Sequence, residues 1–304
     1  MTLRDMTYIT TIAEEKSITR AAARLYLAQP ALSQCVQKVE KELGSPVFIR
    51  GTGGVTLTAE GQCFLDFAYK TLRGQKDFEK QLLDLKNAGH GEILLGFTGT
   101  QATHVLPYFL PQFKERFPHL EIILVEAPSD EIENRLIRGE IEVGILHPPI
   151  IHEELESFEV SRDEMVIIPR SSSRFQPFIY FMENEHTPYL DIEFLRNEPL
   201  VLTKPEQRSR MVCEQIFHKA GICPMIRQSF KNIGTTCALA QVGYATTIAP
   251  AKQLPDELKR RGYYKIDPRF SVPYSFAVAT RQDTYLSVAA RKLLELLHEI
   301  EGTF

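Results

Sequence analysis

The sequence contains no apolar run that approaches the ~20 residues needed to cross a bilayer. Cysteine is sparse: five residues in 304, with no C-x-x-C pair, which excludes a disulfide framework. A large excess of one charge is also missing, since 35 Lys and Arg stand against 39 Asp and Glu, a net charge of −4. This balance excludes a uniformly basic nucleic-acid coat, but it permits a small basic module on an acidic body.

What is present is the composition of an ordinary globular protein, with 43% hydrophobic and 24% charged residues. At ~100–200 residues per domain, the length predicts two or three folded units. The first residues are too polar for a signal segment, so we expect a cytoplasmic protein. Residues 1–58 hold seven basic and five acidic side chains, a net +2, while the remainder carries −6. This modest asymmetry supports a nucleic-acid module only together with a matching structural pattern.

The first ~60 residues have the pattern of short helices separated by tight turns. Ser17 is a good N-cap for a helix over 18–25, because its hydroxyl can accept an unpaired backbone N–H. Pro30 is tolerated in the first turn of a third helix, which opens at Gln29. Two short strands, 48–50 and 55–57, are predicted around a glycine-rich tip.

A long helix is predicted from the N-cap candidate Thr58 to about residue 87. At 1.5 Å per residue it would form a rod of ~45 Å. Its apolar positions step by threes and fours: Phe64, Ala68, Leu72, Phe78, Leu82 and Leu85. One rod cannot bury such a stripe alone, so we expect a partner helix. The alternative is packing against its own chain.

The pattern of apolar residues changes after residue 90. Strand-like runs at 93–97, 121–125 and 141–146 alternate with helix-like segments over 104–117 and 130–138. This alternation is typical of a parallel sheet with helices on its faces. A second such unit starts at 165–168, and strand 274–279 and helix 286–300 end the chain. Two α/β halves of similar size suggest a cleft between them.

The span 17–34, SITRAAARLYLAQPALSQ, together with LGSPVFIR at 43–50 and LTAEG at 57–61, closely resembles the LysR-type transcriptional regulators. The match is specific in residues 1–61 and generic beyond them. The resemblance implies an α/β protein with a winged helix-turn-helix over 1–58, a linker and dimerisation helix over 59–88, and a two-lobed, periplasmic-binding-protein-like effector domain over 91–304. Lobe I would comprise 91–163 and 268–304, and lobe II 164–267. Gln34 departs from the family, which often has Arg there, and so does Lys16, where glycine is common.

Physical reasoning assigns DNA contacts within this module. A recognition helix of ~15 residues fits the major groove with its N-terminal residues at base edges. Amide and hydroxyl side chains there can bond bases, proline can meet a thymine methyl, and basic or wing residues suit phosphates. The predicted contact residues are Gln29, Pro30, Ser33, Gln34, Lys38, Arg50 and Thr52. The implied partners are promoter DNA and further copies of the chain in a homodimer or homotetramer, with RNA polymerase as a candidate; no membrane, metal or cofactor is implied.

Strand ends and helix starts in the second half predict a small-molecule site between the lobes. A helix N-terminus with hydroxyls favours an anion, especially a carboxylate. The resemblance places the effector at Thr98, Thr100, Gln101, Ser129, His147, Thr203, Ile233 and Thr235. Ser and Thr at these positions could equally be helix caps. The aromatic segment 171–189 could line a pocket or repack the second lobe, and the latter is favoured.

Three rival functions start from other features. An enzyme would need Cys213, Cys223 or Cys237 with His218, but the spacing suits neither a metal nor a thiolate–imidazole pair. A redox-sensing member of the same family would need paired cysteines, and Phe217 stands at the second redox position. A stand-alone solute-binding protein would not need the DNA module.

Overall fold

The computed structural model describes residues 1–51, 54–86, 91–99, 105–170 and 173–300. Its internal contacts divide the chain into two compact units, Met1–Ala88 and Gly89–Phe304. We call them the N-terminal unit and the C-terminal unit. None of the described helices is long and apolar enough to cross a membrane.

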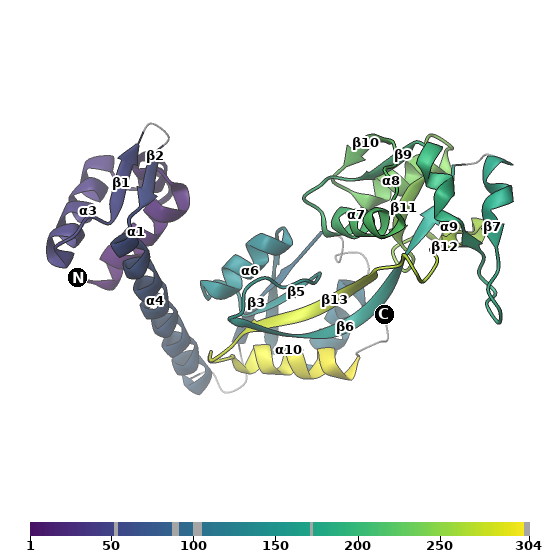
Figure 1. Ribbon diagram of the computed structural model, residues 1–304. Coiled ribbons are helices and arrows are strands. Elements are labelled where there is room, and N and C mark those ends of the chain that lie inside the picture. Colours follow the sequence, from purple (N-terminus) through teal and green to yellow (C-terminus); the bar gives the residue numbers. More distant parts are fainter. Residues whose placement is uncertain (52–53, 87–90, 100–104, 171–172, 301–304) are drawn as a thin grey trace. The chain divides into compact units, whose positions relative to one another are not determined.

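The N-terminal unit contains three short helices, a hairpin and one long helix (Figure 1). In chain order they are α1 (Leu3–Glu15), α2 (Ile18–Arg24), α3 (Gln29–Leu43), β1 (Phe48–Gly51), β2 (Gly54–Leu57) and α4 (Ala59–Lys86). Both predicted caps are confirmed. The Ser17 hydroxyl accepts the backbone N–H of Arg20 at 3.3 Å, and the Thr58 hydroxyl accepts that of Gly61 at 2.8 Å.

Two close backbone approaches hold the hairpin in place. A Cβ on Gly61 would lie 2.1 Å from the Val47 carbonyl oxygen, so only glycine lets α4 start against the strand that follows α3. Gly54 has φ +118°, and a Cβ there would lie 2.2 Å from the Lys16 carbonyl oxygen. The hairpin is thereby fixed against the turn that precedes α2.

The predicted apolar stripe of α4 divides into two parts. Phe64 and Ala68 are buried in the core of the N-terminal unit, and Leu72 packs against that core. Further along, Phe78 is 62% exposed and Leu85 is 79% exposed. The first turns therefore follow the alternative of packing on their own chain, while the later turns keep an uncovered apolar face.

Among the described residues, a nine-stranded sheet runs through the C-terminal unit, and we call its first part, with the strand order β4-β3-β5-β13-β6, the sheet of lobe I. Its strands are β3 (Gly91–Phe97), β4 (Leu120–Glu126), β5 (Val143–Leu146), β6 (Leu155–Ile168) and β13 (Pro273–Arg281). The first three are parallel, as predicted, but β13 runs antiparallel to both β5 and β6. The helices are α5 (Leu106–Arg116), α6 (Ser129–Ile137) and α10 (Val288–Glu299), and α6 lies on the opposite face of the sheet from α10 (Figure 1).

Lobe II is connected to lobe I through β6. From Leu155 to Glu164 this strand pairs with β13 of lobe I, and from Met165 to Ile168 it pairs with β11 of lobe II. The further elements of lobe II are β7 (Ile179–Tyr180), β8 (Tyr189–Leu190), β9 (Leu200–Thr203), α7 (Arg208–Ala220), β10 (Ile226–Phe230), α8 (Ile233–Gln241), β11 (Thr247–Pro250), α9 (Asp256–Arg261) and β12 (Tyr264–Lys265). Two 3₁₀ turns, Ser173–Phe178 and Ile192–Asn197, complete it.

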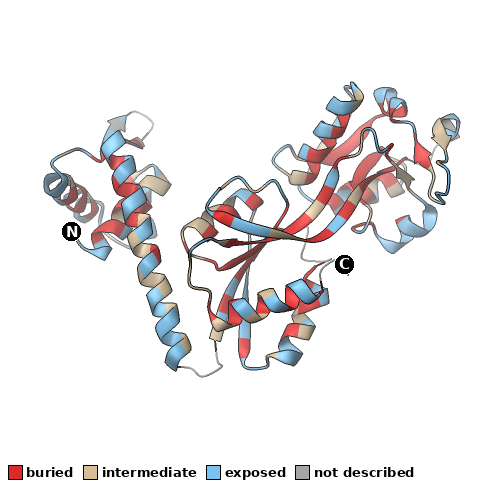
Figure 2. Ribbon diagram, turned by 60° about the horizontal axis from the view of Figure 1, so that its bottom comes forward, coloured by how far each residue is buried: buried red, intermediate tan, exposed pale blue. Residues whose placement is uncertain are grey.

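Buried residues lie on the sheets and on the inner faces of the helices (Figure 2), and Phe175 and Phe178 of the aromatic segment pack against the core. Phe175 packs edge-on against Phe194 and Tyr264 with ring centroids 6.3 and 5.4 Å apart. Tyr180 stacks on Tyr189 at 5.6 Å. Phe175 and Phe178 therefore pack within lobe II, as predicted, while Tyr189 also lines a cavity, so the segment serves both of the predicted alternatives.

Candidate DNA-contact face and interlobe site

The N-terminal turn of α3 presents polar side chains on a rigid base. Its other face buries Leu32, Cys35, Val36 and Val39 in the unit's core. Gln29, Pro30 and Gln34 are exposed and Ser33 is half-buried. The Gln29 amide nitrogen donates to the Ser33 hydroxyl oxygen at 2.8 Å, so these two predicted contacts form one patch. The Ser33 hydroxyl keeps its own proton to donate outward.

Lys38 lies further along α3 and is held by α1. Its ammonium donates to the Asp5 carboxylate at 2.6 Å, and the Lys38 side chain remains 48% exposed. Burial alone would raise the pKa of Asp5. The hydrogen bonds from Lys38 and from Thr2 outweigh burial and lower that pKa to about 2. Lys38 therefore joins α3 to α1, a role that its sequence position did not reveal.

The hairpin of β1 and β2, which is the predicted wing, is linked to α3. One Glu40 carboxylate oxygen accepts the backbone N–H groups of Val47 at 2.8 Å and Phe48 at 3.2 Å. On β1, the backbone of Arg50 pairs with Val55, and only the backbone of Arg50 is described. Thr52 lies outside the described residues.

The predicted interlobe residues come from strand ends and helix starts of both lobes. Thr98 follows β3 and is 9% exposed, and Ser129 begins α6 at 8%. The predicted residues at the starts of α6 and α8 do not cap these helices. Pro128 precedes α6 and provides no side-chain cap, and Asn232 caps α8. Ile233 is buried in a lobe II core, and Thr235 is exposed. Thr100 and Gln101 lie outside the described residues.

His147 follows β5 and is 3% exposed. Its Nδ1 lies 2.9 Å from the Ser275 carbonyl oxygen and its Nε2 lies 2.9 Å from the Tyr274 hydroxyl. Burial lowers the pKa of His147 to about 4, and the positive charge of Arg208 adds to this. The imidazole is therefore neutral near pH 7, and both of its nitrogens are engaged with β13.

Thr203 ends β9 and is 4% exposed. Its hydroxyl lies 2.8 Å from that of Ser209, at the start of α7. Its carbonyl accepts the Arg210 guanidinium at 3.1 Å. The structure thus places Thr203 in a buried polar cluster on lobe II.

Two charged residues outside the predicted set lie between the lobes. Glu133 on α6 is 1% exposed, and the side chain of Arg208 on α7 is 10% exposed. Their closest oxygen and nitrogen atoms are 3.4 Å apart. The sequence did offer one indication of Glu133. It lies four residues after the predicted residue Ser129, so both fall on one face of α6.

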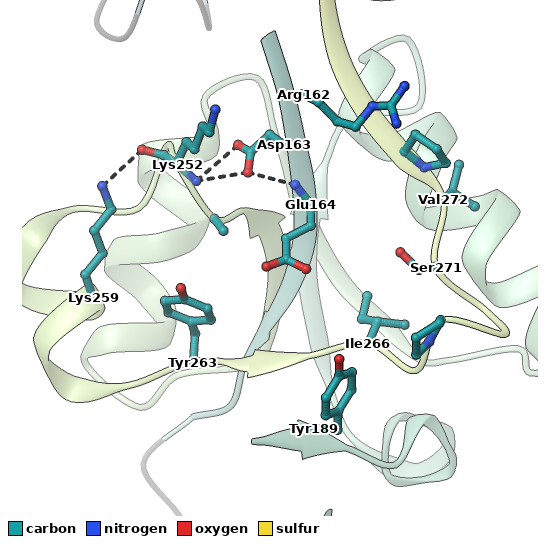
Figure 3. A pocket seen from close by; sticks show the side chains of 13 residues that line it. Arg162, Asp163, Glu164, Tyr189, Lys252, Lys259, Tyr263, Ile266, Ser271 and Val272 are labelled. Carbon is teal, nitrogen blue, oxygen red and sulfur yellow. Dashed lines mark hydrogen bonds between the residues drawn. The ribbon is translucent and has the colours of Figure 1, made fainter. Parts of the chain in front are cut away.

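A separate cavity of about 730 Å³ lies beside the two chain segments that connect the lobes, residues 162–164 and 266–273 (Figure 3). Asp163 on β6 points to the backbone N–H groups of Lys252, at 3.1 Å, and of Glu164, at 2.8 Å. Burial raises the pKa of Asp163 to about 6 against these hydrogen bonds. The cavity is lined by Arg162, Asp163, Glu164, Tyr189, Ala251, Lys252, Lys259, Tyr263, Ile266, Pro268, Ser271, Val272 and Pro273.

Two of the three cysteines considered for chemistry, Cys213 and Cys237, have the environments of structural residues, while Cys223 is exposed. Cys213 and Cys237 are each 1% exposed, and burial raises their pKa values to about 12 and about 11. Such thiols are poor nucleophiles near neutral pH. Among the described residues, no group of three His, Cys, Asp or Glu side chains could hold a metal ion.

Comparison with known proteins identifies the architecture. Residues 3–62 match the model of bacterial regulatory helix-turn-helix proteins of the LysR family, and residues 86–301 match that of the LysR substrate-binding domain. The chain belongs to the LysR family of transcriptional regulators. It is 27% identical to the uncharacterised regulator YcgK of Bacillus subtilis, over 100% of this chain and 96% of that protein. It is also 27% identical to AlsR of Bacillus subtilis, over 83% of this chain and 81% of AlsR.

Solved LysR-family structures share the fold. The regulator HinK from Pseudomonas aeruginosa aligns with a TM-score of 0.60 at 24% identity, over 100% of this chain and 99% of HinK. CbnR aligns with a TM-score of 0.59 at 22% identity, over 99% of both chains. CbnR has also been solved in complex with its target DNA, and that structure aligns with a TM-score of 0.57. The LysR-type architecture expected from residues 17–61 is confirmed.

Proposed function

We propose that this LysR-family regulator reads promoter DNA with the N-terminal turn of α3 and with the wing. The observation that carries the proposal is the patch of Gln29 and Ser33, joined at 2.8 Å beside exposed Pro30 and Gln34. A hydrogen bond within the patch fixes two side chains before binding, which reduces the entropy lost on contact. Arg50 and Thr52 of the wing and Lys38 of α3 would face phosphates.

The C-terminal unit would bind a small effector between lobes I and II, with a carboxylate as the favoured class. Thr98, Ser129, His147 and Thr203 lie at strand ends and helix starts on the two lobes, and Thr100, Gln101, Ile233 and Thr235 complete the predicted set. Ligand binding would stabilise one arrangement of the lobes. The change would reach DNA through a homodimer or homotetramer held by the uncovered face of α4, with RNA polymerase as a further partner in the cytoplasm.

The decisive experiment measures DNA discrimination. An operator is first selected from a random duplex library with the wild-type protein. Gln29→Ala and Ser33→Ala should each weaken operator binding by ~1–3 kcal/mol, about 5- to 150-fold, while binding to random duplex changes little. Gln75→Ala is the matched control, because Gln75 makes the same kind of bond along α4, to Glu79 at 2.8 Å. If both α3 variants keep wild-type discrimination, α3 is not the reading helix.

A further inference from the structure

The contact between Glu133 and Arg208 joins the two lobes at their buried polar surfaces. Glu133 belongs to α6 of lobe I, and Arg208 is the first residue of α7 in lobe II. Both side chains are at least nine-tenths buried, with exposures of 1% and 10%. A buried ion pair is costly to form unless its geometry and hydrogen bonding are good.

The geometry of this pair is poor for Arg208 and good for Glu133. One Glu133 oxygen accepts the backbone N–H groups of Ile151 at 2.8 Å and His152 at 3.3 Å, so lobe I satisfies this carboxylate. The Arg208 guanidinium has five N–H donors. Within the described residues its contacts are two long ones, to Glu133 at 3.4 Å and to the Met211 sulfur at 3.8 Å. Arg208 therefore has unused capacity to bond an acceptor.

Arg208 is also close to two of the residues predicted to bind the effector, His147 and Thr203. Its charge contributes to the lowered pKa of His147. Its neighbour Ser209 lies 2.8 Å from the Thr203 hydroxyl, and Glu133 shares a face of α6 with Ser129. Burial keeps His147 neutral, and the other buried guanidinium of lobe II, that of Arg210, bonds Glu214 at 2.6 Å and the Thr203 carbonyl at 3.1 Å. Arg208 is therefore the cation whose donors are left for an anionic ligand at this position.

We propose that Arg208 is the charge anchor for a carboxylate ligand between the lobes, and that Glu133 competes with that ligand for the guanidinium. This inference rests on the proposed interlobe effector site and adds its anchor and its internal competitor. A carboxylate can take two parallel N–H bonds from one guanidinium, which a contact at 3.4 Å does not achieve. Transfer of Arg208 from Glu133 to the ligand would release α7 from α6, so binding would change how the lobes are held together.

The test uses the full-length protein and acids paired with their neutral amides: acetate, benzoate and succinate, each against acetamide, benzamide and succinamide. Dissociation constants are measured by calorimetry. At least one acid should bind more tightly than its amide. Arg208→Gln should weaken that acid by about 10- to 150-fold and leave its amide unchanged. Arg208→Lys keeps the charge without the planar fork, and should cause a smaller loss.

Glu133→Gln supplies an independent arm, because it preserves the acceptor for Ile151 and His152 while removing the competing charge. It should tighten the acid several-fold and leave the amide unchanged. Arg196→Gln is the control, since Arg196 makes an exposed pair with Glu193 on the same lobe. It should change neither constant.

Three results would overturn the inference: no acid binds above its amide, Arg208→Gln and Arg208→Lys bind the acid as wild type does, or Glu133→Gln fails to tighten it. The thermal midpoint of each variant establishes that the protein is folded. If an acid and its amide bind wild type equally well and both bind Arg208→Gln unchanged, an interlobe site would stand without Arg208 as its carboxylate anchor. Failure of the DNA-reading proposal would appear separately, as unchanged operator discrimination in the Gln29 and Ser33 variants.

Discussion

The predicted contact residues of the two units differ in how they are partnered. On α3, Gln29, Pro30 and Gln34 are exposed on a helix whose other face is buried. In the C-terminal unit, His147 and Thr203 are less than 5% exposed and bonded within the protein. The first arrangement suits a surface that reads a large rigid partner. The second requires a small ligand to fit among, or to replace, existing internal partners.

The largest expected effect concerns the separateness of the two units. Ile12 and Phe109 are each 0% exposed, in different cores. Ile12→Ala should destabilise the N-terminal unit by ~2–5 kcal/mol, and Phe109→Ala the C-terminal unit by ~3–5 kcal/mol, through lost burial and a remaining cavity. Scanning calorimetry should show that each variant lowers a different unfolding transition. If either variant lowers both transitions equally, the units unfold as one.

The second prediction concerns His147 and Asp163, two buried titratable groups of the C-terminal unit. As pH falls, they change the free energy of unfolding in opposite directions. His147 has a pKa of about 4 in the folded chain against 6.5 when exposed. The unfolded chain therefore takes up the proton first, and the free energy of unfolding falls as pH drops from 6.5 to 4. Asp163 has a pKa of about 6 against 3.8, so the folded chain takes up its proton first. Its contribution rises as pH drops from 6 to 4. Each effect has an upper limit of about 3 kcal/mol.

Urea unfolding between pH 4 and 7 separates the two effects. In the wild-type protein they largely cancel. Asp163→Asn should expose the loss of stability caused by His147, and His147→Gln should expose the gain caused by Asp163. The same pH dependence in both variants and in the wild type would show that neither group titrates as its environment indicates.

The helix starts could be predicted from the sequence because their chemistry is local. Ser17 and Thr58 each bond a backbone N–H three residues away, so the capping residue and its helix lie in the same short window. The long strand β6 was only partly predicted. Its first part, from Leu155 to Glu164, is rich in charged residues and pairs with β13 more than 100 residues later. Propensity along the chain does not report such a partner.

The pair of Glu133 and Arg208 at the candidate site could not be predicted from the sequence for the same reason. Glu133 and Arg208 are 75 residues apart, and each has the sequence context of a charged residue on a solvated helix. Only the fold brings them together. The position of His147 at the end of a strand was predicted and is confirmed, but its bonds to Ser275 and Tyr274 depend on β13, more than 120 residues away.

A third prediction concerns the link between α3 and the wing. Glu40→Ala removes the acceptor shared by the Val47 and Phe48 N–H groups, and should lower the stability of the N-terminal unit by about 2 kcal/mol. Glu40→Gln keeps an acceptor and should cost less. Glu42→Ala is the control, because Glu42 is exposed and pairs with the terminal amine. Equal midpoints for Glu40→Ala and Glu42→Ala in calorimetry would contradict the link.

The smallest expected effect tests Lys38, which has an internal partner of opposite charge in Asp5. A cation that neutralises one phosphate changes the slope of log K against log salt by about 0.9. Arg50→Ala should remove about that much, if the wing contacts a phosphate. Lys38→Met should remove less, because Asp5 already neutralises Lys38 at 2.6 Å before DNA arrives. Asp5→Asn should steepen the slope, because it leaves Lys38 an uncompensated cation. Operator binding at four salt concentrations measures all three slopes. If Lys38→Met and Arg50→Ala reduce the salt slope equally, Lys38 is a full phosphate contact. The ion pair with Asp5 would then not weaken the contact between Lys38 and DNA.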